Sequence, residues 1–125
     1  MRFKILAVED LPEARVLLKH FLKEQYDAEA ASDLNSALTM ASEQDFDLFL
    51  LDINLGGGGS GFDVLRLLRA QPQYQDTPAL AVTVHGVSWD PGIFEEAGFS
   101  GVVTKPFRKQ ELLDAIAKAL PSPAP

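Results

Sequence analysis

The stretch Phe46-Asp47-Leu48-Phe49-Leu50-Leu51-Asp52 joins an apolar run to a lone carboxylate, and a glycine-rich loop follows it. An apolar run of this length is typical of a β-strand that is buried on both faces. A second apolar run, Phe3 to Val8, ends at two further acids, Glu9 and Asp10. Because ligands bind at the carboxyl ends of the strands in open α/β sheets, we expect these acids at one edge. We therefore predict a cluster of three carboxylates, which repel one another and bind a hard divalent cation.

Composition is that of a single globular domain. The chain has 125 residues, 46% of them hydrophobic, which is enough for one domain with a substantial core. No cysteine is present, which excludes a disulfide framework and a thiolate metal site. The net charge of −7 argues against nucleic-acid binding by this domain alone.

No segment is expected to enter a membrane. Glu9, Asp10 and Glu13 interrupt the first apolar run far too early for a signal peptide. Nothing in the chain approaches the roughly 20 consecutive apolar residues of a membrane-spanning helix. We therefore expect a cytoplasmic domain, and the absence of cysteine is compatible with that location.

Strand and helix patterns alternate along the chain. Apolar runs predict strands at residues 3–8, 28–31, 48–51, 79–84 and 101–103. Five βα repeats with buried strands predict an α/β fold with a parallel, doubly wound sheet and helices on both faces. We assign residues 1–120 to this domain and the proline-rich residues 121–125 to a tail or the start of a linker.

The helices are predicted from caps and apolar stripes. The first opens at Leu11-Pro12 with Asp10 as its N-cap, and its expected stripe contains Val16, Leu17, His20, Phe21 and Leu22. Ser32 or Asp33 caps the second, which carries Leu34, Ala37, Leu38 and Ala41. The others are expected at 62–68, 93–97 and 110–120, the last with Leu112, Leu113, Ile116 and Leu120 on one side. Because Asp90-Pro91-Gly92 contains strong helix breakers, the helix near 93–97 should start late or be short.

Two more polar side chains follow strands of the predicted sheet. Thr83 lies near the end of the fourth strand, and Lys105 follows the fifth. Together with the three acids they suit phosphoryl transfer to a carboxylate. The acids would bind Mg²⁺, which neutralises charge on the phosphoryl oxygens, while Asp52 attacks phosphorus in line. The Lys105 ammonium and the Thr83 hydroxyl would contact the remaining oxygens.

Four motifs are highly specific in their order and spacing, although no one of them is decisive. They are Ile5-Leu6-Ala7-Val8-Glu9-Asp10, Leu50-Leu51-Asp52-Ile53-Asn54-Leu55, Ala81-Val82-Thr83 and Thr104-Lys105-Pro106-Phe107. With these motifs the chain resembles, over essentially its whole length, the receiver domain of two-component response regulators. The resemblance implies a flavodoxin-like fold of the receiver type with five parallel strands.

The resemblance also implies roles for individual residues. Asp52 would be the phosphoacceptor, Asp10 and Asp52 direct Mg²⁺ ligands together with the backbone carbonyl of Asn54, and Glu9 a ligand acting through a water. Lys105 would form a salt bridge with the acyl phosphate, and Thr83 would be the switch hydroxyl. The bond between Lys105 and Pro106 is often cis in such domains.

At the level of the protein, the resemblance implies a phosphoryl donor that is a histidine kinase or a histidine phosphotransfer protein. A receiver catalyses its own phosphorylation and dephosphorylation and is not a metabolic enzyme. Phosphorylation would switch binding to an unidentified output partner, with a phosphorylation-dependent dimer as one form of that output.

The chain departs from the family pattern in three places. The loop after Asp52 contains four consecutive glycines, Gly56 to Gly59, which are costly to order and favour a mobile loop. Val84 stands where the residue after the switch hydroxyl is usually small, so it is expected to crowd the approach to Asp52. Val102 occupies the position of a rotating Tyr or Phe, and Phe99 lies three residues earlier.

Other interpretations remain open at this point. The acids could cap helices, Lys105 could be a surface lysine, and the glycines could form only a flexible connection. One alternative is a receiver-like binding module that has lost phosphorylation. Such a module would not need the complete set of Glu9, Asp10, Asp52, Thr83 and Lys105, which this chain has. A phosphatase with an aspartyl nucleophile would have a second acid at position 54, where this chain has Asn54. An FMN carrier would need a glycine-rich phosphate loop in place of Leu11-Pro12-Glu13.

Overall fold

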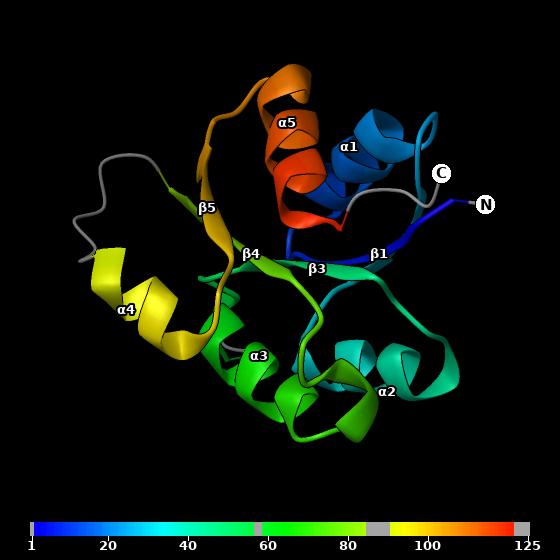
Figure 1. Ribbon diagram of the computed structural model, residues 1–125. Helices are drawn as coiled ribbons and strands as arrows, with labels where there is room; N and C mark the ends of the chain where they lie inside the picture. The colour runs from blue at the N-terminus through cyan, green and yellow to red at the C-terminus, as the bar shows by residue number, and fades with distance from the viewer. Residues whose placement is uncertain (1, 57–58, 85–90, 122–125) are drawn as a thin grey trace.

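The computed structural model describes residues 2–56, 59–84 and 91–121. Within them, five parallel strands form one sheet in the order β2-β1-β3-β4-β5 (Figure 1). The strands are β1 (Lys4–Val8), β2 (Asp27–Ala31), β3 (Leu48–Asp52), β4 (Ala79–Val84) and β5 (Gly101–Lys105). The predicted α/β fold is confirmed, and the last strand is two residues longer than expected, so that Lys105 belongs to it.

The helices cover both faces of the sheet (Figure 1). α1 (Pro12–Leu22) and α5 (Lys109–Ala119) lie on one face, while α2 (Leu34–Glu43), α3 (Gly61–Arg69) and α4 (Pro91–Ala97) lie on the other. A single turn, η2 (Pro72–Tyr74), precedes β4. None of the helices in the described ranges is long and apolar enough to span a bilayer.

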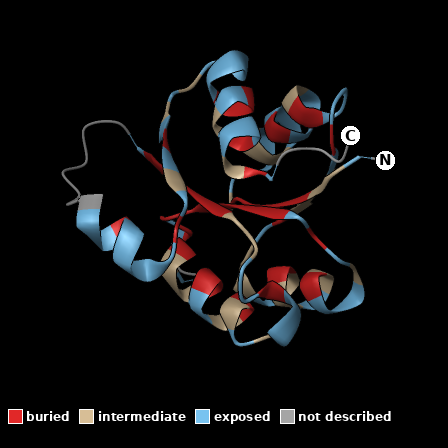
Figure 2. Ribbon diagram, viewed as in Figure 1, coloured by how far each residue is buried: buried red, intermediate tan, exposed pale blue. Residues whose placement is uncertain are grey.

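The core has two layers because successive strand residues point to opposite faces. In β1, Ile5 and Ala7 pack with α1 and α5, whereas Leu6 and Val8 pack on the side of α2 and α3. All five residues of β3 are buried, which places the central strands in the red interior of Figure 2. The fully apolar runs of the sequence therefore mark the middle of the sheet.

The predicted apolar stripe of α1 is wrong in part: Leu22 is buried and Phe21 packs against the core as expected, but the other predicted residues do not. The buried residues of α1 are Leu18 and Leu22, whereas Val16 is 70% and Leu17 47% exposed and His20 is also exposed. Apolar residues occur all around this helix, so the sequence contains competing stripes. Packing against the sheet selects Leu18 and Leu22, which are one turn apart.

The predicted N-cap of α1 is also wrong. The N-cap residue is Leu11, which makes no side-chain cap hydrogen bond, and Pro12 is the first helical residue. The carboxylate of Asp10 instead lies in the acidic cluster described below. A proline in the first turn lacks one of the N–H groups that a cap would satisfy, so the helix tolerates this arrangement.

The other helix predictions agree with the structure. Asp33 caps α2 as predicted, by accepting a hydrogen bond from Ser36 N at 2.8 Å. The sequence interpretation missed the capping box that Ser60 and Asp63 form on α3. As expected, α4 is short, with seven residues. The predicted apolar side of α5 is buried. Residues 122–125 of the predicted tail, and Asp90 of the predicted helix breaker, lie outside the described residues.

Candidate functional site

The sheet brings the predicted site residues together at the carboxyl ends of its strands. Val8 pairs with Leu51 in the parallel register, so Glu9 and Asp10 leave β1 beside Asp52 at the end of β3. One carboxylate oxygen from each of these three acids lies within 4.8 Å of the other two. Oxygen donors of this kind fit a hard divalent cation such as Mg²⁺.

Lys105 supplies positive charge to this cluster. Its Nζ lies 2.6 Å from Glu9 Oε2 and 3.2 Å from Asp52 Oδ2. Burial alone would lower the pKa of Lys105, but the hydrogen bond to Glu9 and the charges of Asp52 and Glu9 outweigh it. The net result is a raised pKa, so the ammonium stays charged. The peptide bond between Lys105 and Pro106 is cis, as the resemblance implied.

Hydrogen bonds orient two of the three carboxylates. Glu9, which is only 1% exposed, accepts from Leu11 N at 3.3 Å and from Lys105. Asp52, which is 5% exposed, accepts from Asn54 N at 3.0 Å through Oδ1 and from Lys105 through Oδ2. Buried carboxylates need such partners because desolvation of an unpaired charge is costly. Asp52 is therefore held in one orientation at the mouth of the sheet.

The glycine-rich loop has specific steric requirements next to these acids. Gly56 has φ +63, and a Cβ there would lie 3.4 Å from Asp10 Oδ2. Gly61 packs so closely that a Cβ would lie 2.7 Å from the carbonyl oxygen of Asp52. The loop is closed by an antiparallel bridge between Asn54 and Ser60. The described glycines thus do more than connect two elements; Gly57 and Gly58 lie outside the described residues.

Two cavities meet at Asp52. One, of about 210 Å³, is lined by the acids, Lys105, Leu11, Asn54, Gly56 and Val84. The other, of about 480 Å³, is lined by Thr83, Val84, Phe62 and the residues around Asp52. Val84 borders both and is 50% exposed, so it forms part of the entrance, as its predicted crowding of the approach requires. Thr83 is 7% exposed and faces the larger cavity.

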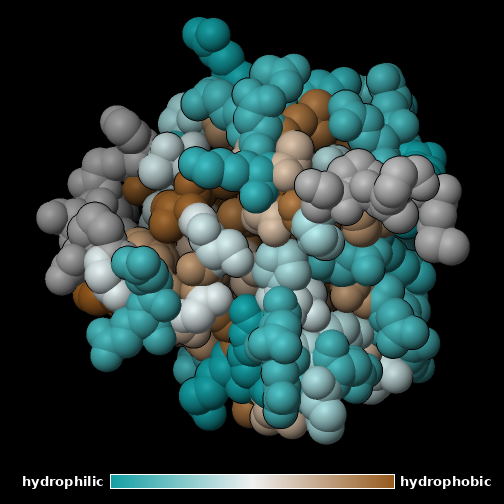
Figure 3. All heavy atoms as spheres, viewed as in Figure 1, coloured by the Kyte–Doolittle hydropathy of each residue, from teal (hydrophilic) through white to brown (hydrophobic). Residues whose placement is uncertain are grey.

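Val102 and Phe99 have different environments. Val102 is 41% exposed on β5, where hydrophobic atoms reach the surface in Figure 3. Phe99 is buried, with its ring centroid 5.7 Å from that of Phe62 and 6.1 Å from that of Phe94. Because Phe99 is part of this packed aromatic cluster, it does not replace a surface aromatic at position 102.

Arg15 is a site residue that the sequence interpretation missed. Its guanidinium donates hydrogen bonds to the carbonyl oxygens of Glu9, at 2.8 Å, and of Asp10, at 3.0 Å. A signal for it exists in the sequence, because side chains in the first turns of a helix lean toward the helix N-terminus. A cation one turn into the helix after Glu9-Asp10 can therefore reach back to them.

Comparisons with known proteins agree with this geometry. The family model for the response regulator receiver domain matches residues 5–117. The chemotaxis protein CheY of Pseudomonas aeruginosa is 33% identical over 117 residues, which cover 92% of this chain and 94% of that protein. The phosphate regulon transcriptional regulatory protein PhoB of Klebsiella pneumoniae is 33% identical over 117 residues, 93% of this chain. The alignment covers 51% of PhoB, so the chain spans about half of that protein.

The same similarity extends to solved structures. The chemotaxis response regulator CheY4 of Vibrio cholerae superposes with a TM-score of 0.88 at 30% sequence identity. That superposition covers 96% of this chain and 100% of CheY4. Since the family model covers almost the whole chain, the chain belongs to the response regulator receiver domain family.

Proposed function

We propose that this domain accepts a phosphoryl group on Asp52, in a Mg²⁺-dependent reaction, from a histidine kinase or a histidine phosphotransfer protein. The observation that carries the proposal is the environment of Asp52. Its carboxylate is oriented by Asn54 N and Lys105 Nζ, borders two cavities, and lies beside two further acids. Family membership supports the same reaction.

In the proposed reaction a carboxylate oxygen of Asp52 forms a bond to phosphorus, and the bond from phosphorus to the donor's imidazole nitrogen breaks. The imidazole leaves with that electron pair and is protonated on departure. When bound, Mg²⁺ would neutralise charge on the phosphoryl oxygens. The residues that would hold it are Asp10 and Asp52, with the carbonyl of Asn54, while Glu9 would act through a water.

Lys105 and Thr83 would stabilise the product. The ammonium of Lys105 already contacts Asp52. After phosphorylation it can form a charged hydrogen bond to an oxygen of the acyl phosphate. The Thr83 hydroxyl can donate to another phosphoryl oxygen, because Thr83 faces the cavity beside Asp52. This full set of groups favours a phosphoacceptor over a receiver-like binding module that has lost phosphorylation.

We propose that the response to phosphorylation occurs mainly in the two loops at the site. The hydroxyl of Thr83 would move toward the phosphoryl group and shift the backbone that begins at Val84. Val102 has no ring and one restricted torsion, so it can move little in response. His85 and the rest of that loop up to residue 90 lie outside the described residues.

The remaining expectations are part of the same proposal. They are a cytoplasmic location, an output partner that binds the phosphorylated form, a phosphorylation-dependent dimer, and a domain of residues 1–120 followed by a tail or linker. The assignment of Asp52 as the phosphoacceptor does not depend on any of them.

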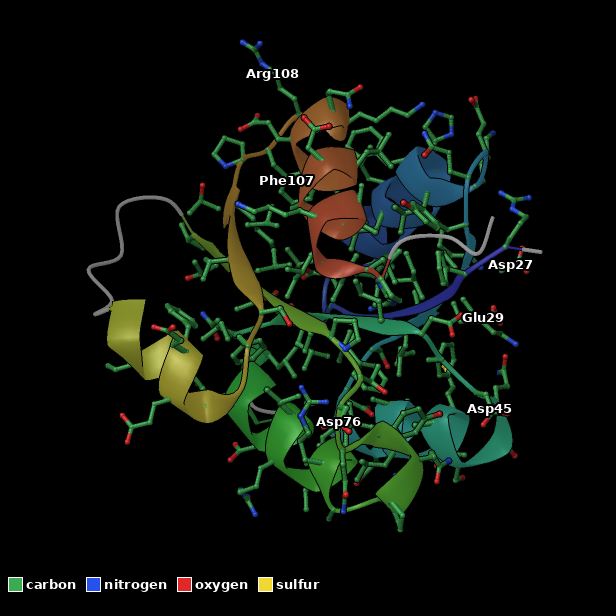
Figure 4. The ribbon with its side chains drawn as sticks, in the orientation of Figure 1. Asp27, Glu29, Asp45, Asp76, Phe107 and Arg108 are labelled. Carbon is green, nitrogen blue, oxygen red and sulfur yellow. The ribbon has the colours of Figure 1, made fainter. Side chains whose placement is uncertain are left out.

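Intact-mass measurement tests the proposal. Wild type is incubated with Mg²⁺ and a small phosphoramidate, and the expected product carries one phosphoryl group. Asp52→Asn should carry none, whereas Asp45→Asn should react like wild type, because Asp45 is exposed at the outer edge of the molecule just after α2 (Figure 4). Equal incorporation in wild type and Asp52→Asn would overturn the assignment.

A further inference from the structure

The segment that carries Glu9 and Asp10 has little regular structure of its own. β1 ends at Val8 and α1 begins at Pro12, so the two acids lie in the connection between them. The N–H of Glu9 is anchored to the carbonyl of Ala31 at 3.0 Å. The helix N-cap, Leu11, has no side-chain cap hydrogen bond. The backbone around Asp10 therefore depends on other contacts for its conformation.

Besides the hydrogen bond from Leu11 N to Glu9 Oε1, Arg15 makes two such contacts with a single nitrogen. The same guanidinium nitrogen donates to the carbonyl oxygens of Glu9 and of Asp10. These two carbonyls flank the Cα of Asp10, so their relative orientation is set by the φ and ψ of that residue. Binding both to one donor restricts both torsions, and this restricts the direction of the Asp10 side chain.

We infer that Arg15 is a positioning residue for the metal site: by holding these two carbonyls, it orients the carboxylate of Asp10 for a divalent cation. The inference rests on the proposed function, since it assumes that the acidic cluster binds Mg²⁺. Partners that orient ligands in this way typically change metal affinity by roughly 10- to 100-fold when they are removed. Ordering the ligand before the cation binds also lowers the entropic cost of binding.

Charge alone predicts the opposite effect. Arg15 forms no ion pair within 4.0 Å of a carboxylate in the described part of the chain; its guanidinium hydrogen bonds are to the backbone carbonyls of Glu9 and Asp10. Removing a positive charge near a cation site should strengthen cation binding by Coulomb's law. Removing a group that orients a ligand should weaken it. The sign of the change in Mg²⁺ affinity therefore separates the two effects.

The experiment is a calorimetric Mg²⁺ titration of wild type, Arg15→Met and Arg15→Lys. Arg15→Met removes charge and donor and should weaken Mg²⁺ binding by roughly tenfold. Arg15→Lys keeps the charge and three donors on a shorter side chain, so it should recover part of that loss. In a phosphorylation assay the Mg²⁺ concentration at half-maximal rate should rise in parallel, while the rate at saturating Mg²⁺ changes by less than about twofold.

The matched control is Arg69→Met. The guanidinium of Arg69 also donates hydrogen bonds to backbone carbonyls, those of Tyr74, Thr77 and Gly98. These carbonyls lie away from the acids. The control should lower stability and leave the Mg²⁺ affinity of the folded protein unchanged.

Each outcome decides the inference. Unchanged or tighter Mg²⁺ binding in folded Arg15→Met would overturn it, as would a wild type that binds no Mg²⁺. If Arg15→Met does not fold, Arg15→Lys decides: its Mg²⁺ affinity must be lower than that of wild type, and an affinity equal to that of wild type would overturn the role of the guanidinium. Absence of phosphate on Asp52 in wild type would instead contradict the proposed function, and the Mg²⁺ titration would still judge Arg15.

Discussion

The ammonium nitrogen of Lys105 lies 2.6 Å from a carboxylate oxygen of Glu9, whose side chain is 1% exposed. The two residues come from the ends of β5 and β1 and are 96 positions apart in the chain. The contact to Asp52 is longer, at 3.2 Å. Glu9 is therefore the principal counter-ion of Lys105 in the unmodified protein. Lys105 lies next to Asp52 but makes its shorter contact with Glu9.

The first prediction concerns this pair. Lys105→Met should lower the free energy of unfolding of the metal-free protein by about 1–3 kcal/mol, because it leaves the carboxylate of Glu9 buried without its charged partner. Urea denaturation of both proteins without metal measures the difference. Lys109→Met, an exposed lysine of α5, is the control and should change the midpoint little. Identical midpoints for wild type and Lys105→Met would contradict the prediction.

The pH dependence of the same difference is the second prediction. The pKa of Lys105 is raised in the folded protein, so its stabilising contribution is fully present below the unfolded-state pKa. The gap in unfolding free energy between wild type and Lys105→Met should stay constant from about pH 7 to 9. It should shrink as the pH rises above the ordinary lysine value of about 10.4. Urea melts at several pH values measure the gap; a gap that already closes between pH 7 and 9 would count against the contact.

The third prediction is that Asp10→Ala stabilises the metal-free protein and weakens Mg²⁺ binding. Removing one of three clustered like charges relieves repulsion worth about 1 kcal/mol, while the site loses a ligand and at least roughly tenfold in affinity. A metal-free thermal melt and a calorimetric titration measure both effects. Asp45→Ala, outside the cluster, should change neither. Wild-type Mg²⁺ affinity in Asp10→Ala would rule out Asp10 as a direct ligand.

Two glycines of the loop provide the fourth prediction. Gly61→Ala should destabilise the protein by about 1–3 kcal/mol, because the new Cβ would lie 2.7 Å from the carbonyl oxygen of Asp52. Gly56→Ala meets only an ordinary contact at 3.4 Å, so its cost, about 1–2 kcal/mol, comes from the positive φ. Gly56→Asn should recover part of that cost, since Asn tolerates this conformation better, whereas Gly61→Asn should not. Denaturant melts of the four variants check this order.

Hydrogen exchange tests the proposed switch and is the fifth prediction. Adding Mg²⁺ and beryllofluoride, a phosphoryl mimic, should slow amide exchange at Gly56, at Gly59 to Gly61 and around Val84. Little change is expected at Val102, because a valine has no ring to turn inward. Asp52→Asn under the same conditions is the control and should show no slowing. Protection at Val102 without protection in the two loops would show that the response occurs elsewhere.

Much of the fold could be predicted because its signals are local. The apolar runs of β1, β3 and β4 give strand positions within a residue or two. The predicted cap Asp33 starts α2 through a hydrogen bond from a residue three positions away, and the Ser60 cap of α3, which the sequence interpretation missed, is equally local. α1 was harder, because Val16 and Leu17 are as apolar as Leu18 and Leu22, and only docking on the sheet selects the buried pair.

The sequence by itself determined the alternating strands and helices and the acids, hydroxyl and lysine that end the strands, because hydrophobic periodicity and strand ends are local properties of the chain. The tertiary structure alone decided that Lys105 contacts Glu9 more closely than Asp52, that Gly61 lies against the Asp52 carbonyl, and that Arg15 binds the carbonyls beside Asp10. The first two depend on strand register and on how loops close over the sheet edge, and the third on the angle at which α1 leaves β1. Lys105 and Glu9 are 96 positions apart, so packing among distant residues sets their contact. Arg15 lies only five or six positions from the carbonyls that it binds, so the sequence puts it within reach, but the packing of α1 on the sheet fixes the contact.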